Sequence, residues 1–317
     1  MANIARFLAQ ISKRNIGLKR VVVAAPHDVA TLLAIDLARQ ELNIEAILVG
    51  DRKRILVAAE MSGVNLEHYE VLSVVGDLPI AESSVRLISE GKGHVLMKGL
   101  IDTSVLLKQV LKKEHGLRTG SLLSHTALLL PPNEDHYYLL TDAGMNISPS
   151  LLEKKKIIEN SVQMAHALGN PKPNVAMLCA KEKVYEKMPA TLDAEALKKL
   201  CAEGEIEGCI VSGPLQLDLA ISRESASMKE CDDPVAGNVD IFVAPTIEVG
   251  NVFGKALKYM GGYAYAGVVL GAKIPVVVVS RSDSEQEKLL SIAMACAGDF
   301  GSANQNTKAE SELEGAL

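Results

Sequence analysis

Four polar clusters in the sequence carry residue types that could bind and react with an anionic substrate. The last follows the apolar run PVVVV and brings Ser280, Arg281 and Asp283 within four residues. A guanidinium can hold phosphate through a bidentate fork, a hydroxyl can donate to a developing oxyanion, and a carboxylate can accept a proton. This cluster predicts a catalytic site that holds phosphate. The structural alternative is a helix cap with a salt bridge.

The other three clusters lie where expected strands begin or end, the usual place for sites in open α/β sheets. In MKGLIDTS a strand turns into a helix whose first N–H groups could bind an anion, although Asp102 or Thr103 could serve only as the helix cap. HGLRTGSLLSH combines a guanidinium with small hydroxyls that suit a phosphate, although a polar loop before a strand would look similar. TDAGMNISP places polar groups after a strand, although a turn that caps the next helix would look similar. The candidate binding residues in these clusters are Lys98, Thr103, Arg118, Thr119, Ser124, His125, Asp142 and Asn146.

Short β-branched runs alternate with helical patterns along the chain, which is typical of an α/β sheet with crossover helices. Strands are predicted at 21–25, 44–49, 71–75, 95–97, 122–130, 137–141, 175–180, 209–212, 241–244, 267–270 and 276–280. Helices are predicted at 28–41, 79–89, 103–113, 149–168, 193–203, 251–259 and 284–297. Runs such as VVVAA and PVVVV are apolar throughout, as expected of strands buried on both faces. The sequence therefore predicts a three-layer α/β architecture.

The length of 317 residues predicts two domains, at roughly 150 residues per domain. The breaker and charge cluster PPNED suggests one crossing between them, and the Gly261-Gly262 pair with the strand after it suggests a second. We therefore expect a discontinuous α/β domain, residues 1–131 with 267–317, and a second α/β domain at 132–266. The polar C-terminal residues predict a frayed tail or a last helical turn.

Composition argues against several classes of protein. A net charge of −6 and the absence of Trp disfavour a nucleic-acid binder, because phosphate affinity rests on clustered Lys and Arg and base stacking on aromatic rings. The five cysteines form no C-x-x-C pair, so neither a zinc knuckle nor a thioredoxin-like motif is predicted, and we expect no metal. The sequence has neither a signal-peptide pattern nor a run of 18 apolar residues, which predicts a cytoplasmic protein without a membrane partner.

Familiar catalytic motifs are missing as well. Residues 250–256 resemble a phosphate loop, but they are one residue short of it and lack the magnesium-binding hydroxyl. The first strand runs into Pro26-His27-Asp28 instead of G-x-G-x-x-G, which disfavours a nicotinamide cofactor bound as in a Rossmann fold. H-E-x-x-H and G-x-S-x-G do not occur. The four polar clusters are therefore the remaining candidates for a site.

From about Lys98 to Ile292 the chain resembles the family of phosphate acetyltransferases and phosphate butyryltransferases. The matching segments are VLMKGLIDTS, HGLRTGSLLSH, LLTDAGMNISP, LEKKKIIENSVQMAHALG, VAMLCA, GCIVSGPLQLDLAIS, DDPVAGNVDIFVAPTIEVGN with Lys255, and IPVVVVSRSDS with Lys288. The MKG start, the TDAGMNI turn and the SRSDS ending are more similar to the butyryl than to the acetyl enzymes. The order and spacing of these segments are too extensive for chance.

The resemblance implies a reversible reaction in which butanoyl-CoA and phosphate give butanoyl phosphate and CoA. Coenzyme A is then a co-substrate, and no other cofactor is implied. The resemblance also implies a fold like that of isocitrate and isopropylmalate dehydrogenases, with the active site in a cleft between two domains and a homodimer or higher homo-oligomer as the assembly. By the same resemblance, Ser280 and Arg281 form the catalytic pair, and Arg118 and Thr119 face phosphate.

Two carboxylates of this chain match the position of the family's catalytic carboxylate. Butyryl-type sequences place it at Asp283, which we favour, whereas the spacing of the acetyl enzymes places it at Glu287. The family's Gly-Asn-x-x-x-Lys element matches Gly250, Asn251 and Lys255. Gly254 stands where the family commonly has an aromatic residue, which leaves the packing around the acyl chain open.

The leading hypothesis is therefore a phosphate acyltransferase for a short acyl chain, butyryl or branched. One alternative is a phosphate acetyltransferase acting on acetyl-CoA. Another is a metal- and NAD-dependent dehydrogenase of related fold, although the clustered Asp set that a divalent metal needs is not seen. A third is a non-catalytic CoA-binding paralogue. The chain has only 4 Phe and 7 Tyr, which offer few partners for stacking on the adenine of CoA.

Overall fold

The computed structural model describes residues 2–14, 17–280 and 282–300. These residues form two compact units, each with its own set of neighbouring strands. Unit 1 comprises Met1–Ile4 and Leu122–Leu270, and unit 2 comprises Ala5–Ser121 and Gly271–Leu317. Helix α1 (Ala2–Ser12) opens the chain. The predicted C-terminal tail falls largely on residues 301–317, which lie outside the described residues.

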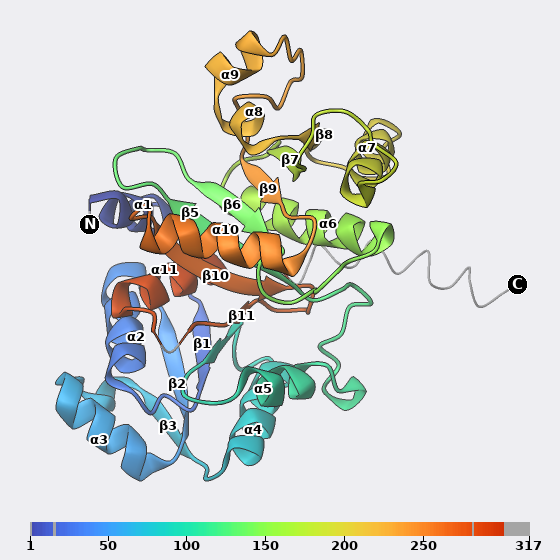
Figure 1. The fold of residues 1–317 in the computed structure, drawn as a ribbon. Helices are drawn as coiled ribbons and strands as arrows, with labels where there is room; N and C mark the ends of the chain where they lie inside the picture. The colour runs from blue at the N-terminus through green and yellow to red at the C-terminus, as the bar shows by residue number, and fades with distance from the viewer. Residues whose placement is uncertain (1, 15–16, 281, 301–317) are drawn as a thin grey trace, which may run out of the picture. The chain divides into compact units, whose positions relative to one another are not determined.

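Unit 2 is built on a parallel sheet in which the strand order is β3-β2-β1-β4-β11. The strands are β1 (Arg20–Ala24), β2 (Glu45–Gly50), β3 (Glu70–Ser73), β4 (Val95–Lys98) and β11 (Val276–Val277). The helices are α2 (Val29–Leu42), α3 (Arg52–Ser62), α4 (Asp77–Ser89), α5 (Thr103–Val110) and α11 (Glu285–Cys296), with short 3-10 turns η1 (Leu66–His68) and η2 (Lys113–His115). Figure 1 shows α2 and α3 on one face of this sheet and α4 and α5 on the other.

The apolar runs of unit 2 form strands covered on both faces. Val21, Val22 and Val23 of β1 have no exposed surface, and the same is true of Leu96 and Met97 in β4. Because every strand in this sheet is parallel to its neighbours, all carboxyl ends lie at one edge, and each is followed by a loop that leads into a helix. Two of the polar clusters lie at this edge, one after β4 with Lys98 and Asp102 and one after β11 with Ser280 and Asp283.

Unit 1 is built on a mixed sheet in which the order is β10-β5-β6-β9-β7-β8. The strands are β5 (Ser124–Leu130), β6 (Tyr138–Thr141), β7 (Asn174–Leu178), β8 (Ile210–Leu215), β9 (Ile241–Val243) and β10 (Ala264–Leu270). β5 is antiparallel to both β10 and β6, and the remaining pairs are parallel. The helices are α6 (Leu151–Ala167), α7 (Pro189–Ala202), α8 (Leu217–Ile221), α9 (Arg223–Met228) and α10 (Ile247–Tyr259).

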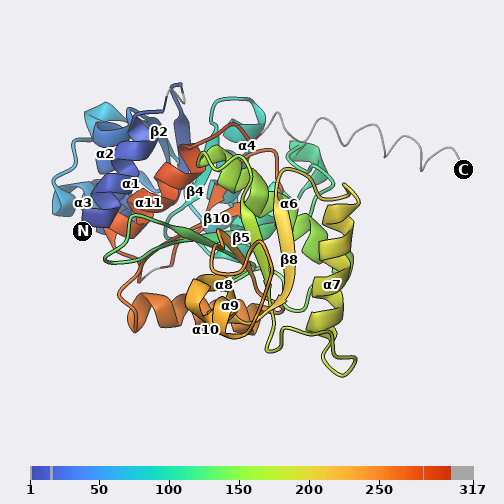
Figure 2. The ribbon, with the colours of Figure 1, turned by 90° about the horizontal axis from the view of Figure 1, so that it is seen from above.

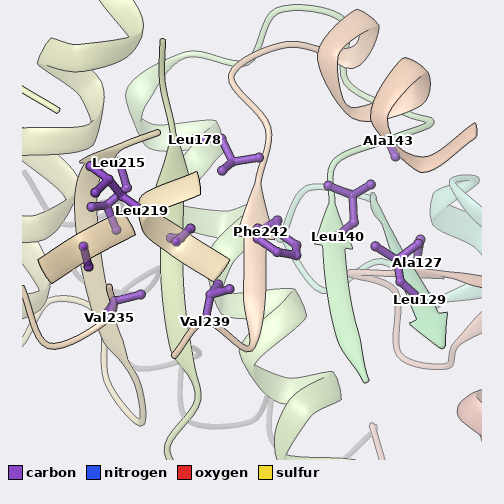
Figure 3. Packing of buried hydrophobic residues seen from close by; sticks show 13 residues of the cluster. Ala127, Leu129, Leu140, Ala143, Leu178, Leu215, Leu219, Val235, Val239 and Phe242 are labelled. Carbon is purple, nitrogen blue, oxygen red and sulfur yellow. The ribbon is translucent and has the colours of Figure 1, made fainter. Parts of the chain in front are cut away.

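Helices α6 and α10 cover opposite faces of the unit 1 sheet (Figure 2). On the α10 face, Phe242 of β9 packs with Leu140, Ala127 and Leu129 in one buried cluster (Figure 3). Two glycines allow α10 to approach this cluster closely. A Cβ at Gly254 would lie 2.9 Å from Cε2 of Tyr265, and one at Gly250 would lie 2.5 Å from the carbonyl oxygen of Asp142. Gly254 therefore lies on the inner side of α10 and allows the helix to pack closely against the sheet.

The structure confirms a mixed α/β fold with helices on both faces of a sheet, and it contains a strand at every predicted position. Helices α1, α3, α8 and α9 were not predicted from the sequence. The last predicted strand, 276–280, is paired only at Val276–Val277. No described helix is long and apolar enough to cross a membrane.

The bounds of the two units differ from the predicted domain crossings at 131/132 and 266/267. Residues 131–135 form the loop between β5 and β6, which are antiparallel neighbours within one sheet. β5 is paired along its whole length with β10, so both strands belong to the same unit. The unit bounds therefore fall before β5, at 121/122, and after β10, at 270/271. The functional division into two domains stays a prediction.

Candidate functional site

The Ser280 segment forms a tight turn at the carboxyl edge of the unit 2 sheet. Ser280 is exposed, and its backbone N–H donates to Oδ2 of Asp283 at 2.6 Å. Its hydroxyl lies 3.0 Å from the hydroxyl of Ser282. The ammonium of Lys288 on α11, whose side chain is buried, donates to the carbonyl oxygen of Ser280 at 3.1 Å. The structure thus brings Ser280 and Asp283 together, while the predicted catalytic Arg281 lies outside the described residues.

The two candidate carboxylates have different local partners. Oδ2 of Asp283 accepts from the Ser280 backbone inside the turn. Oε2 of Glu287 accepts from the N–H of Ser284 at 3.0 Å, and the Ser284 hydroxyl accepts from the N–H of Glu287 at 3.3 Å. This reciprocal pair is a capping box that begins α11. Glu287 therefore has a structural role, and Asp283 is the carboxylate that contacts the serine segment.

Lys98 ends β4 on the strand beside β11, because Met97 is paired with Val277. Its side chain is only 5% exposed, and its ammonium donates to the carbonyl oxygens of Gly99 at 3.2 Å and Ile101 at 3.1 Å. The N–H of Gly99 in turn donates to Ala24 at 2.8 Å, and a Cβ at Gly99 would collide with the carbonyl of Ala25. Lys98 thus holds together a loop that is fastened to the end of β1.

Thr103 is the first residue of α5, but the cap of this helix is Asp102. Oδ1 of Asp102 accepts from the N–H of Ser104 at 2.7 Å. The hydrogen bond from the Ser104 side chain, followed by that from its backbone, holds the pKa of Asp102 below its ordinary value. The helix-cap alternative is therefore confirmed for Asp102. Thr103 sits beside it at the same edge of the sheet as Lys98 and Ser280.

The loop containing Arg118 and Thr119 is anchored to the segment that precedes β11. The Thr119 hydroxyl donates to the carbonyl oxygen of Gly271 at 2.6 Å, and Arg118 forms an isolated β-bridge with Ala272. Arg118 is exposed. Because Ser280 follows β11 whereas Gly271 precedes it, these hydrogen bonds do not by themselves bring Arg118 beside Ser280.

Asp142 and Asn146 organise a loop after β6 in unit 1. Asp142 is 3% exposed, and Oδ1 accepts from the N–H groups of Gly144 at 2.8 Å and Met145 at 3.0 Å. Nδ2 of Asn146 donates to Oδ2 of Asp142 at 2.5 Å and to the carbonyl oxygen of Leu123 at 2.9 Å. The structure brings this predicted pair together, but their polar atoms face the protein backbone. They therefore position the loop.

Helix α10 fastens the same loop through Asn251, whose Nδ2 donates to the carbonyl oxygen of Ala143 at 3.2 Å. Lys255 lies one turn further along α10 and is exposed. His125, at the start of β5, is buried with its ring against Gly267, and a Cβ at Gly144 would lie 3.3 Å from the ring carbon Cγ. His125, Asp142, Asn146 and Asn251 thus gather at one edge of unit 1.

Ser124 and His125 are adjacent in sequence but face opposite sides of the sheet, because side chains alternate along a strand. The Ser124 hydroxyl accepts from Nδ2 of Asn160 on α6 at 2.8 Å, whereas His125 shares its face with Ala127 and Leu129 beneath α10. Asn160 also donates to Leu122 at 2.9 Å. Neither Asn160 nor Lys288 was singled out from the sequence as a site residue, although both lie within the segments that resemble the family, and both are buried.

The candidate residues thus fall into two sets. Unit 2 holds Lys98, Thr103, Arg118, Thr119, Ser280 and Asp283, and unit 1 holds Ser124, His125, Asp142, Asn146, Asn251 and Lys255. The unit 2 set offers a hydroxyl, a carboxylate and several cations, which can bind an anion and move a proton. In the described part of the chain, no group of three or more His, Cys, Asp or Glu side chains is placed to hold a metal ion.

The five cysteines are free thiols. Burial raises the pKa of Cys179 to about 11 and that of Cys209 and Cys296 to about 12. A thiol is nucleophilic only as its thiolate. These three cysteines are therefore packing residues, as the absence of a C-x-x-C motif predicts.

Comparison with known proteins shows which family this chain is similar to. The profile of the phosphate acetyl/butaryl transferase family matches residues 77–296. The chain is 42% identical to the phosphate butyryltransferase of Clostridium acetobutylicum over 88% of its own length and 92% of that protein. It is 37% identical to the phosphate acetyltransferase of Rickettsia typhi over 92% and 84% of the two chains. The crystal structure of a branched-chain phosphotransacylase from Enterococcus faecalis V583 matches 88% of this chain and 98% of its own, with 32% identity and a TM-score of 0.78.

Proposed function

The chain belongs to the phosphate acetyl/butaryl transferase family, and on this premise we propose that it transfers a short acyl group between coenzyme A and inorganic phosphate. The reaction is butanoyl-CoA plus phosphate giving butanoyl phosphate plus CoA, and it is reversible. The observation that carries the proposal is the Ser280–Asp283 turn, which lies within the family match and presents a hydroxyl and a carboxylate at the carboxyl edge of a parallel sheet.

In the direction that consumes acyl phosphate, the CoA thiol must lose its proton before its sulfur attacks the acyl carbon. A free thiol has a pKa of about 8.5, and a positioned carboxylate can assist its deprotonation by ~100-fold or more. We assign this role to Asp283, which already contacts the serine segment. Glu287 is the alternative, but its carboxylate is used in the capping box of α11.

The attack forms a C–S bond and a tetrahedral intermediate whose oxygen carries the negative charge. A hydrogen bond from the Ser280 hydroxyl would stabilise this oxyanion, and a donor of this kind contributes ~3 kcal/mol in other enzymes. The intermediate collapses when the C–O bond to phosphate breaks, and inorganic phosphate leaves with both electrons of that bond. We propose that Arg281 and Arg118 neutralise the phosphate and that Thr119 and Lys98 assist in binding it.

The remaining assignments follow from the resemblance and stay predictions. We propose that Thr103 of unit 2 helps to bind substrate, together with Ser124, His125, Asn251 and Lys255 of unit 1. Asp142 and Asn146 would contribute by holding their loop in place. The cleft between domains, the cytoplasmic location, the homodimer and the absence of a cofactor other than the co-substrate CoA are likewise predictions.

The test is release of free thiol from acyl-CoA in the presence of phosphate, measured over acetyl-, propionyl-, butanoyl- and isobutanoyl-CoA. We expect kcat/KM to be highest for butanoyl- or isobutanoyl-CoA, which agrees with the higher identity to a protein named for butyryl transfer than to one named for acetyl transfer. A maximum at acetyl-CoA would favour the phosphate acetyltransferase alternative. Failure to release thiol from every one of these substrates would refute the proposal.

Two other classes of function have their own signatures. A metal- and NAD-dependent dehydrogenase would change the absorbance of reduced nicotinamide when a hydroxy acid and a divalent metal are supplied. A non-catalytic paralogue would bind CoA in calorimetry without turnover. We expect neither result, since the sequence matches the transferase family over most of its length.

A further inference from the structure

Lys288 is a buried cation that is hydrogen-bonded to the backbone of Ser280. It is the one charged side chain in the buried run 288–297, and it is 3% exposed. Its ammonium donates to the carbonyl oxygen of Ser280 at 3.1 Å, and among the described residues it forms no ion pair. A buried ammonium without a counter-charge is costly, so packing alone does not explain why a lysine stands here.

The position of Lys288 in α11 explains how it reaches Ser280. It is the fourth residue of this helix, whose start is fixed by the capping box of Ser284 and Glu287. Side chains on a helix tilt toward its N-terminus, so the stem of Lys288 runs back past Ser284. α11 packs against β11 and β4, and Leu289, which follows Lys288, is 2% exposed. The ammonium is therefore held by a core helix beside the segment that follows β11.

The backbone of Ser280 is hydrogen-bonded on both sides. Its N–H donates to Oδ2 of Asp283 at 2.6 Å, and its carbonyl oxygen accepts from the N–H of Asp283 at 3.2 Å as well as from Lys288. The two bonds to Asp283 close the turn on itself, whereas the bond from Lys288 connects the turn to α11. The Ser280 hydroxyl is close only to Ser282 among the described residues. The backbone is thus fixed and the hydroxyl stays exposed.

The neighbouring strand ends in a similar arrangement. Lys98 is also buried, and its ammonium donates to the carbonyl oxygens of Gly99 and Ile101 after β4. An ammonium has three donors and no acceptor, so it can hold carbonyl groups that the sheet leaves unpaired at strand ends. Buried lysines therefore fix the loops after two adjacent strands of unit 2, β4 and β11.

We propose that Lys288 is a positioning residue for acyl transfer, which fixes the Ser280 backbone so that the hydroxyl lies where the oxyanion forms. The inference rests on the proposed function, because it takes the Ser280 hydroxyl as the group that stabilises this oxyanion. Lys288 does not touch the substrate and acts through the Ser280 carbonyl. Misplacement of a reacting group by about 1 Å can lower a rate by ~100-fold, so a loss of this hold is measurable.

The first experiment replaces Lys288 by methionine, which keeps the unbranched stem and removes the charge. The Ser280 carbonyl keeps its hydrogen bond from Asp283, and a buried charge can often be replaced by an apolar group of similar volume without loss of stability. We therefore expect Lys288→Met to melt at or above the wild-type temperature. With butanoyl phosphate and CoA, we expect kcat to fall by ~10- to 100-fold and KM to stay within about threefold.

Lys154→Met is the matched control, because Lys154 on α6 is also buried but is paired with Asp193 at 2.6 Å. Its loss leaves that carboxylate unpaired, so we expect a lower melting temperature and a kcat within about twofold of the wild type. If Lys288→Met keeps the wild-type kcat, or if it loses kcat together with a melting temperature that falls as far as the control's, Lys288 is a structural residue and the proposal is wrong.

A double-mutant cycle tests whether Lys288 acts through Ser280. Ser280→Ala should lower kcat by ~100-fold, the usual effect of removing one oxyanion donor. In that background Lys288→Met should lower kcat by less than about threefold, because residues that act through one group are not additive. If the two losses multiply in full, Lys288 acts independently of the Ser280 hydroxyl and the proposal fails.

Hydrogen exchange separates this inference from the proposed function, because it needs no turnover. The amides of Ser280 and Asp283 are both hydrogen-bonded within the turn, and in Lys288→Met we expect them to exchange about tenfold faster or more, with residues 289–296 unchanged. If the wild type releases no thiol but this loosening is seen, the proposed function fails while the hold of Lys288 on Ser280 stands. Unchanged exchange overturns that hold whatever the activity.

Discussion

At the scale of single residues, Asp283 and Glu287 are four positions apart yet have distinct environments. Asp283 contacts the Ser280 backbone, and Glu287 closes a capping box with Ser284. We expect Asp283→Asn to lower kcat by ~100-fold with little change in KM, because a carboxylate that assists thiol deprotonation acts in the transition state. Steady-state kinetics with butanoyl phosphate and CoA gives both parameters.

Glu287→Gln is the matched control for that variant. Glutamine can also fill the third position of a capping box, so the helix start is kept and the negative charge is removed. We expect kcat to fall by less than about threefold and stability to change by under ~1 kcal/mol. The reverse pattern, with a large kcat loss in Glu287→Gln and a small one in Asp283→Asn, would move the proton acceptor to Glu287.

The residue scale also shows how far the sequence predicts the site. The polar clusters are correctly placed at strand ends, because apolar runs interrupted by small polar residues mark those ends. The direction of each side chain is not readable in the same way. The Asp142 carboxylate accepts hydrogen bonds from backbone N–H groups of its own loop and from the Asn146 side chain. The positions of those N–H groups depend on the backbone conformation, which the pattern of residue types does not specify. The split between Ser124 and His125 could have been found from strand alternation alone.

At the scale of elements, α3 was not predicted although Asp51 caps its start and Gly63 ends it, because the charges of its first turn oppose the usual pattern. A first turn normally carries acids, whereas RKRILVAAEMS begins with three cations and buries only Ile55, Ala58 and Ala59. The start of α11 was readable, since Ser284 and Glu287 form the capping-box pattern three residues apart. Rules on caps and first-turn charges therefore identify a helix such as α11, which follows them. They miss a helix such as α3, whose first turn carries the opposite charge.

A second element-scale feature is the loop before β9, which is held by Asp233. Its carboxylate accepts from the Ser212 hydroxyl on β8, from Lys198 on α7 at 3.0 Å, and from the N–H of Val235 at 3.0 Å. Burial raises the pKa of Asp233, but the hydrogen bonds from Ser212, Val235 and Lys198 outweigh this effect and hold the pKa below its ordinary value. The folded protein therefore favours the ionised carboxylate.

Because the folded pKa lies below the unfolded value of about 3.9, the stabilisation from Asp233 is complete above that value and is lost as the pH falls through the folded pKa. We expect Asp233→Asn to reduce the free energy of unfolding by ~1 to 2 kcal/mol at pH 7. Thermal unfolding followed by circular dichroism at pH 7, 5, 4 and 3 should show the gap between wild type and variant closing below about pH 4. A gap that is constant with pH would show that ionisation of Asp233 is not involved.

At the scale of the whole molecule, the outward side of α10 is an apolar surface that the described residues leave exposed. Val249, Val252, Tyr259 and Met260 are 43%, 67%, 66% and 88% exposed. At 100° per residue they fall within an arc of roughly 100°, which is the width of a stripe that usually faces a partner. The inner side of the helix is already packed through Gly250 and Gly254. Single exposed apolar residues need no explanation, but a continuous stripe does.

We propose that a second copy of the chain covers this stripe, as the homodimer implied by the family resemblance would require. In an antiparallel pair of α10 helices, Val249 and Val252 of one copy meet Tyr259 and Met260 of the other. In such a pair the exposed Glu248 near the start of the helix would approach Lys255 and Lys258 in the second half of its partner, so the charges would be complementary. The antiparallel helix dipoles also attract each other.

We therefore expect the protein to sediment at micromolar concentration with twice the mass of one chain, and the double variant Val252→Asp/Met260→Asp to sediment as a single chain. Each substitution would bury a carboxylate in an apolar interface, which is costly unless the charge is paired. Met61→Asp is the control, because Met61 is 73% exposed on α3 and lies outside the stripe. A wild type that sediments as one chain, or a double variant that stays paired, would rule out self-association through α10, and dissociation of Met61→Asp would instead place the contact in unit 2.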